Sequence, residues 1–263
     1  MTAPVPKLVG MVHLLPLPGS PRFGGSIDEV VDVAVADAAT LIDAGFPALL
    51  VENFGDAPFH ADQVPPETVA AMTVAVAAVT RSGVPVGVNV LRNDGLAALG
   101  IAAATGARFI RVNVLTGTMF TDQGPIVGRA ADIQRRRVMV APDVEVWADV
   151  MVKHATPPAG MDIGQAGRDV IERGLADAVI FSGSGSGEDP RREDGELLKK
   201  TLPSGTRIVV GSGATVGNLE LLLDVADTVI VGSGIKVGGE TGNRPDPERA
   251  MALVEEAGRQ GLI

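Results

Sequence analysis

Short apolar runs rich in β-branched residues alternate with longer amphipathic segments along the whole chain, and this alternation restricts the possible folds most. The apolar runs, read as strands, are Leu8–Val12, Ala48–Glu52, Val86–Val90, Phe109–Val112, Glu145–Val150, Ala178–Ser182, Arg207–Val210 and Thr228–Val231. The segments between them have helical length, as in Ile27–Ala44, Pro66–Ser82, Asp94–Thr105, Asp162–Arg173 and Val216–Asp224. Strands that are apolar on both faces and separated by helices are typical of a parallel sheet.

Repeated strand–helix units without a break in composition predict one closed (β/α)8 TIM barrel over residues 1–263. A doubly wound open sheet with additional units is the alternative. Glycines at the expected helix ends support the unit boundaries, because glycine adopts the left-handed conformation that ends many helices. These glycines are Gly45, Gly83, Gly106, Gly174 and Gly205. Asp246-Pro247 has the cap-then-proline order that begins a helix.

Composition excludes several classes of function. The net charge is −10, which argues against binding to nucleic acid or to anionic lipid. The absence of cysteine excludes disulfides, thiolate nucleophiles and cysteine-bound zinc. The most apolar stretch, Val69–Val79, is too short to span a bilayer. No signal peptide is visible, so we expect a cytoplasmic protein.

Polar residues stand at or near the end of nearly every expected strand. They are His13, Glu52, Asn53, Asn89, Asn113, Asp149, Ser182, Ser212 and Ser233. In a barrel these strand ends meet at one rim, and that rim holds the active site. The simpler interpretation is that strand ends are polar because they reach solvent. The number of charged and amide side chains favours a functional rim.

Two similar glycine turns follow the last two expected strands. The first contains Gly211, Ser212 and Gly213, and the second contains Gly232, Ser233 and Gly234, with Lys236 close behind. Backbone N–H groups of such turns converge on anions, and barrels bind phosphate after strands seven and eight. The turns predict a phosphate-binding site, which Arg244 can also reach. Tight glycine turns without any ligand are the alternative.

The first two loops carry further candidates for chemistry. His13 precedes a rigid loop with three prolines, and it is either an acid, base or ligand or a histidine hydrogen-bonded under that loop. Glu52 and Asp56 either bind a cation or share acid–base work. Alternatively, Asp56 caps a turn and Glu52 pairs with a neighbouring charge.

The fifth expected strand supplies the remaining catalytic candidates. If the strand continues, Asp149 and Lys153 both face the barrel axis while His154 points to the other side. A buried lysine beside a carboxylate is a Schiff-base nucleophile, a proton donor or a partner for phosphate charge. A structural ion pair between them is the alternative.

Loops and metal sites give weaker indications. The run from Gly183 to Pro190 is either a lid or a mobile connection, and Leu115–Pro125 is a second lid or an oligomer contact. With three histidines and no metal motif, we assign no metal site, although Mg²⁺ held by Glu52, Asp56 or Asp149 stays open. No organic cofactor is expected. Barrels of this kind often form homo-oligomers, but no interface can be read from the sequence.

Several long motifs resemble the BtpA/SgcQ family, in order and across nearly the whole chain. They are His13–Pro21, Val51–Phe59, Asp149–Ala155, Phe181–Pro190, Gly211–Asn218 and Gly232–Pro245. The resemblance implies a (β/α)8 barrel. It also implies either a link to sugar-phosphate metabolism or, as for the family's namesake, a role in photosystem I accumulation with peripheral membrane association. It carries no catalytic residues over.

Two hypotheses of function remain. The first is an enzyme for a phosphorylated sugar or nucleoside-like metabolite, performing isomerisation, aldol-type cleavage or glycosidic cleavage. Asp149 would be the general acid or base, Lys153 the electrophile or charge partner, and Glu52 the second carboxylate. The second is a non-catalytic assembly factor for a membrane complex such as photosystem I. A phosphate sensor that binds without turnover is a third option.

Overall fold

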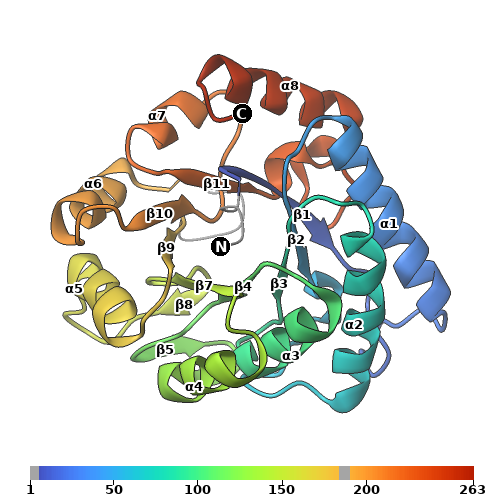
Figure 1. The fold of residues 1–263 in the computed structure, drawn as a ribbon, viewed down its shortest axis with the longest axis horizontal. Coiled ribbons are helices and arrows are strands. Elements are labelled where there is room, and N and C mark those ends of the chain that lie inside the picture. Colours follow the sequence, from blue (N-terminus) through green and yellow to red (C-terminus); the bar gives the residue numbers. More distant parts are fainter. Residues whose placement is uncertain (1–5, 184–189) are drawn as a thin grey trace.

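The computed structural model describes residues 6–183 and 190–263. Within them, the parallel strands are β1 (Leu8–His13), β2 (Leu49–Glu52), β3 (Val86–Asn89), β4 (Phe109–Val112), β7 (Glu145–Asp149), β9 (Ala178–Phe181), β10 (Arg207–Val210) and β11 (Thr228–Val231). They close into a barrel in the order β1-β11-β10-β9-β7-β4-β3-β2 (Figure 1). Leu8 pairs with Val229 where the ring closes. The predicted TIM barrel is confirmed, and the open sheet is excluded.

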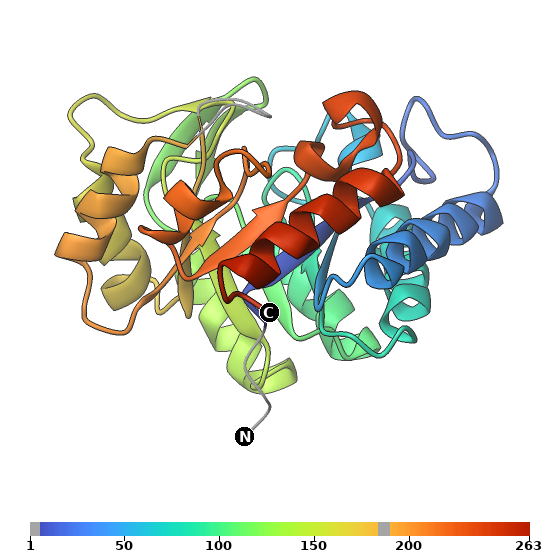
Figure 2. The same cartoon turned by 90° about the horizontal axis from the view of Figure 1, so that it is seen from above.

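Helices surround this barrel on its outside (Figures 1 and 2). They are α1 (Ile27–Asp43), α2 (Pro66–Thr80), α3 (Gly95–Thr105), α4 (Ala130–Val140), α5 (Ile163–Arg168), α6 (Arg192–Thr201), α7 (Leu219–Leu223) and α8 (Pro247–Arg259). The side chains of Ser26, Asp94, Asp162 and Asp246 accept hydrogen bonds from the first amides of α1, α3, α5 and α8. These caps satisfy donors that the helices leave open, which fixes where each helix begins.

The barrel interior is filled by side chains rather than by solvent. Phe109 stacks on Trp147 with ring centroids 4.2 Å apart, and both are fully buried. Gly87 of β3 leaves the space that the Phe109 ring occupies, because a Cβ there would lie 2.3 Å from the ring. This packed apolar interior therefore forms a rigid base beneath the loops at the carboxyl ends of the strands.

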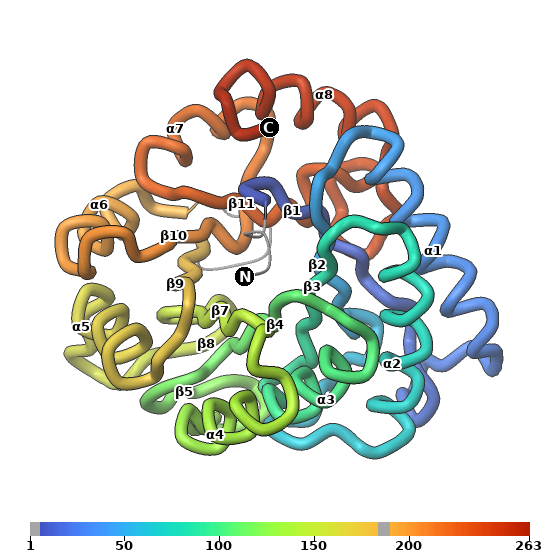
Figure 3. Tube along the Cα trace, in the orientation of Figure 1, coloured from blue at the N-terminus to red at the C-terminus, as the bar shows by residue number. Residues whose placement is uncertain are grey.

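A small antiparallel sheet lies beside the barrel. Strands β5 (Thr118–Thr121) and β6 (Gly124–Val127) form a hairpin within the long fourth loop, and β5 also pairs with β8 (Ala155–Thr156) (Figure 3). Its apolar side packs as a separate cluster of Val114, Met119, Ile126 and Val152. The sequence analysis expected a lid or contact loop here and did not anticipate strands. In the side view the hairpin, drawn in green, rises at the same end of the barrel as the loop after β1, drawn in blue (Figure 2).

None of the helices in the described part of the chain combines the length and apolar character needed to cross a membrane.

Candidate functional site

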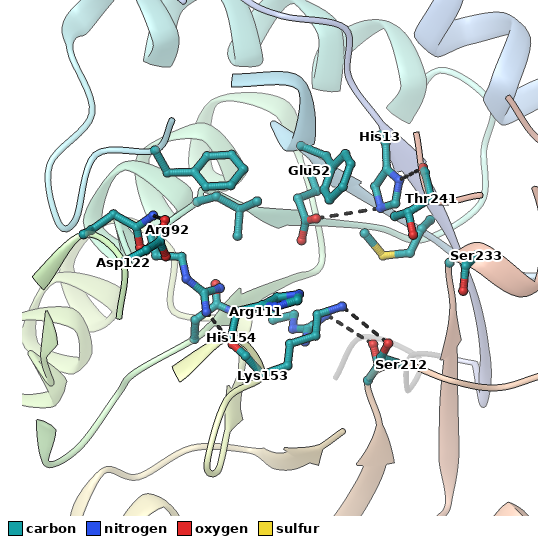
Figure 4. Close-up of a pocket in the computed structure, with 18 residues that line it drawn as sticks. His13, Glu52, Arg92, Arg111, Asp122, Lys153, His154, Ser212, Ser233 and Thr241 are labelled. Carbon is teal, nitrogen blue, oxygen red and sulfur yellow. Dashed lines mark hydrogen bonds and ion pairs between the residues drawn. The ribbon is translucent and has the colours of Figure 1, made fainter. Parts of the chain in front are cut away.

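A cavity of about 410 Å³ opens among the carboxyl ends of the barrel strands (Figure 4). Of the predicted candidates, its lining includes His13, Glu52, Asn113, Lys153, His154, Gly211, Ser212, Gly232 and Ser233. Residues that the sequence analysis did not select also line it: Met11, Phe54, Phe59, Leu91, Arg92, Arg111, Asp122, Gln123 and Thr241. The volume is within the range of roughly 300–1,000 Å³ that is usual for small-molecule sites.

His13 and Glu52 form one wall of the cavity. The imidazole stacks on Phe54 with centroids 4.6 Å apart, and its Nδ1 lies 3.1 Å from the backbone oxygen of Thr241. A carbonyl can only accept, so Nδ1 carries the hydrogen. The lone pair of Nε2 then faces Oε1 of Glu52 at 3.7 Å.

Burial shifts both of these groups toward their neutral forms. Burial, together with the nearby charge of Lys236, lowers the pKa of His13 to about 3. Burial also raises the pKa of Glu52, although Arg111 and Lys153 oppose the shift. The pair therefore consists of a neutral imidazole that accepts a proton less readily than usual and a carboxyl group that gives one up less readily than usual.

Lys153 reaches the cavity by a route that the sequence analysis did not foresee. Strand β7 ends at Asp149, and the backbone then turns through left-handed conformations at Met151 (φ 47°) and His154 (φ 56°). The predicted continuation of the strand is therefore wrong, because these two residues break the alternation. The loop is held instead by β8, and Lys153 Nζ donates to Ser212 Oγ at 3.4 Å. Burial and the charge of Arg111 lower the pKa of Lys153.

Asp149 is fully engaged by neighbours and is not part of the cavity lining. Its two oxygens accept hydrogen bonds from Nε and Nη2 of Arg111, each at 2.8 Å, and Asn113 Nδ2 donates to it at 3.1 Å. Asn89 in turn donates to Asn113. Asp149 thus forms the expected alternative, a buried ion pair, but its partner is Arg111 rather than Lys153.

Asn53 and Asp56 hold loops together beside the cavity. Asp56 accepts from the Leu17 amide at 2.8 Å and from Asn53 at 3.0 Å, while Asn53 also accepts from the Leu91 amide. Asp56 is therefore separated from Glu52, because Glu52 lines the main cavity and Asp56 lines a different, smaller pocket. Across the two described ranges of the chain, no group of three or more histidine, aspartate or glutamate side chains is placed to hold a metal.

The two glycine turns after β10 and β11 meet, but only part of each faces the cavity. Gly211, Ser212, Gly232 and Ser233 line it, whereas Gly213 and Gly234 do not. A Cβ on Gly234 would lie 2.3 Å from the Ala214 oxygen. Close packing of one turn on the other therefore explains this glycine without a ligand.

Three other predicted residues, Lys236, Arg244 and Ser182, do not line the cavity. Lys236 is fully buried, and its Nζ has no hydrogen-bond partner among the described residues. Arg244 does not approach the cavity, since it pairs with Asp37 of α1. The Ser182 hydroxyl is buried beside Gly211, also without a partner in the described part of the chain. The predicted lid after β9 lies largely outside the described residues, at 184–189.

Arg92 and Arg111 are the main charged residues that sequence reasoning missed. Arg111 was detectable in principle, because an arginine inside the apolar strand Phe109–Val112 needs a buried partner. Arg92 follows β3 and lines the cavity together with Asp122 and Gln123 of the hairpin tip, so only the tertiary structure brings it to the site. Its Nη2 donates to the Lys153 backbone oxygen at 2.6 Å.

Solved structures with the same architecture are barrel proteins of low sequence similarity. The native KDPGal structure has a TM-score of 0.62 and 16% identity, covering 100% of this chain and 99% of that one. KGPDC from Streptococcus mutans has a TM-score of 0.57 and 15% identity, covering 97% and 99%. Phosphoribosyl anthranilate isomerase from Thermus thermophilus has a TM-score of 0.56 and 15% identity, covering 97% and 99%.

Sequence relatives are much closer. Photosystem I biogenesis protein BtpA from Synechocystis is 46% identical over 249 residues, covering 94% of this chain and 86% of that protein. Putative sgc region protein SgcQ from Escherichia coli is 29% identical over 256 residues, covering 95% and 93%. The sequence model of the BtpA family matches residues 5–259 of this chain. The chain therefore belongs to the BtpA family.

Proposed function

We propose that this protein is an enzyme that binds a phosphorylated small metabolite, most simply a sugar phosphate, and transfers a proton on it during isomerisation or aldol-type cleavage. One observation carries the proposal: a single cavity joins Lys153 and two glycine turns to a neutral His13 and to Glu52. A barrel neighbour whose name includes a phosphoribosyl group is consistent with such a ligand.

The β10 and β11 turns supply the phosphate end of the site. Lys153 already donates to Ser212 in the first turn. No described residue accepts a hydrogen bond from the amide of Ser212, which lines the cavity. An ammonium group and free N–H groups together bind phosphate oxygens. A cavity with this cationic end also stands out in a chain whose net charge is −10.

Glu52 and His13 supply the proton transfer. Because Thr241 fixes the hydrogen on Nδ1, the Nε2 of His13 is the accepting atom, and it lies on the cavity side next to Glu52. Removal of a proton beside a carbonyl group needs one base and one acid that can exchange roles. These groups suit isomerisation and aldol-type cleavage.

The first test is binding. Ribose 5-phosphate should raise the melting temperature and bind in calorimetry, whereas ribose should do neither. Ser212→Asp should abolish binding, because it places a carboxylate in the cavity lining, and Lys153→Met should weaken it about tenfold or more. Lys200→Met, on the exposed face of α6, is the matched control and should behave as wild type.

The second test is turnover. Wild-type protein in D2O should exchange a carbon-bound hydrogen of its ligand, detected by NMR, and Glu52→Gln should bind the ligand but lose the exchange. Failure of every sugar phosphate to bind the wild type would contradict the proposal. That result would favour a non-catalytic role like the one that the name of the Synechocystis relative indicates.

A further inference from the structure

Arg92 and the glycine turn at Ser212 stand on opposite sides of the barrel mouth. Arg92 follows β3, and Ser212 follows β10. In the ring, β11, β1 and β2 separate these strands on one side, and β9, β7 and β4 separate them on the other. Figure 4 shows Arg92 at one end of the cavity, Ser212 and Ser233 toward the other, and Glu52 between them. The cavity thus has two ends with the proton-transfer pair in its middle.

Arg92 is buried without a paired carboxylate. Arg92 is 6% exposed, and the only described hydrogen bond of its side chain goes from Nη2 to the Lys153 backbone oxygen. No described carboxylate forms an ion pair with its guanidinium, and Asp149, Glu52 and Asp122 act on it only as more distant charges. Most of its N–H groups therefore remain available on the cavity side.

Arg111, in the same cavity, differs from Arg92 because its guanidinium is paired with a carboxylate. It binds both oxygens of Asp149 at 2.8 Å, so its charge is compensated within the protein. A buried guanidinium without such a partner is costly, and its planar fork matches a carboxylate or a phosphate. The difference between the two arginines indicates that the partner of Arg92 comes from outside the protein.

We propose that Arg92 binds a second anionic group of the substrate, at the end remote from the phosphate held by the β10 and β11 turns. This inference rests on the proposed function and narrows it. The substrate class becomes a phosphorylated sugar derivative with a carboxylate or a second phosphate at its other end. Such a molecule would place its central carbons beside Glu52 and His13. The hairpin tip, with Asp122 and Gln123, forms the outer wall of this subsite.

Matched ligands test the subsite. 6-Phosphogluconate and glucose 6-phosphate differ at the end remote from the phosphate, as do fructose 1,6-bisphosphate and fructose 6-phosphate. Calorimetry on the full chain should show the doubly anionic member of at least one pair binding about tenfold or more tightly than its partner. The pair that discriminates tells whether the second group is a carboxylate or a phosphate.

Variants then assign the difference to Arg92. Arg92→Gln should bring the doubly anionic ligand down to the affinity of the sugar monophosphate and leave the monophosphate within about twofold. Arg92→Lys should retain part of the preference, because the charge remains while the fork is lost. Arg135→Gln, at an exposed position of α4, is the control. A melting temperature near that of wild type shows that each variant is folded.

Three outcomes separate the possible failures. If Arg92→Gln weakens both ligands equally, Arg92 only positions the Lys153 loop and the subsite is wrong. If wild type binds both members of each pair equally, the subsite is also wrong while the proposed function stands. If wild type binds none of these phosphates, the proposed function falls, and the subsite falls with it.

Discussion

At the scale of single residues, burial and one carbonyl group decide the state of His13. The Thr241 oxygen fixes the hydrogen on Nδ1, and Phe54 stacks on the ring. Because burial disfavours the charged imidazolium, the side chain stays neutral at acidities where an exposed histidine is protonated. The residue is therefore unprotonated over a wide range of pH, and it is a weaker base than an exposed histidine.

This state predicts a pH dependence of stability. The folded-state pKa of His13, about 3, lies below its unfolded value of 6.5. The unfolded chain therefore binds the extra proton between these values, and stability falls as the pH drops below 6.5. Wild type should lose about 2 kcal/mol more than His13→Gln between about pH 7 and pH 5, measured by urea unfolding.

Nuclear magnetic resonance provides a direct check on the same residue. The ¹⁵N shifts of the His13 ring should report a neutral, Nδ1-protonated tautomer at about pH 5. A His13 ring that titrates near its ordinary value of 6.5 would contradict the structure of this wall of the cavity.

At the scale of elements, the small sheet of β5, β6 and β8 positions the segment after β7, which β7 itself does not reach. The main strand ends at Asp149, and the chain then leaves the barrel through left-handed turns. Pairing of β8 with β5 holds the segment that carries Lys153 and His154. The hairpin has its own apolar cluster, separate from the main core. It therefore forms a local unit whose stability governs the site more than it governs the barrel.

Met119→Ala tests this local unit, because Met119 is buried in that cluster. Loss of its contacts should lower the stability of the hairpin by about 2 kcal/mol or more. Hydrogen exchange at residues 118–127 should accelerate, while exchange in the barrel strands stays within about twofold of wild type. Met251→Ala, exposed on α8, should change neither. Uniform acceleration across the barrel would show that the hairpin is not a separate unit.

At the scale of the whole molecule, packing across the barrel decides what each glycine does. Gly87 lies inside the ring against Phe109, where a Cβ would overlap the aromatic carbons. Gly100 lies on the outer face of α3, where a Cβ would meet nothing within 4 Å. The same chemical change at these two positions should therefore have opposite effects.

Gly87→Ala should destabilise the protein by about 1–3 kcal/mol, because Phe109 and the stacked Trp147 must shift. Gly100→Ala should stabilise it by about 0.5–1 kcal/mol, because alanine loses less backbone entropy in a helix. Urea unfolding of the two variants measures both values. Destabilisation by Gly100→Ala, or none by Gly87→Ala, would contradict the barrel packing described above.

The strand–helix alternation predicts the barrel and the bounds of several of its strands, since each unit is recorded in a local pattern of apolar residues and end signals. β4 and β10 lie at the predicted bounds, and β1 extends the expected run by His13 alone. The ends of parallel strands must meet, so the sequence also predicted His13, Glu52 and Ser212 at a common rim, and all three line the cavity. The local sequence pattern determines the strand bounds and the residues at the strand ends, because both follow from hydrogen bonding and burial within each strand–helix unit.

Tertiary structure alone decided which polar groups pair. Asp149 bonds to Arg111 of a neighbouring strand, and Arg244 reaches Asp37 across more than half of the chain. The arrival of Arg92 and of the hairpin tip at the cavity depends on how separate loops pack. No local pattern contains these choices, because the energy of a buried charge depends on partners that only the folded chain brings within reach.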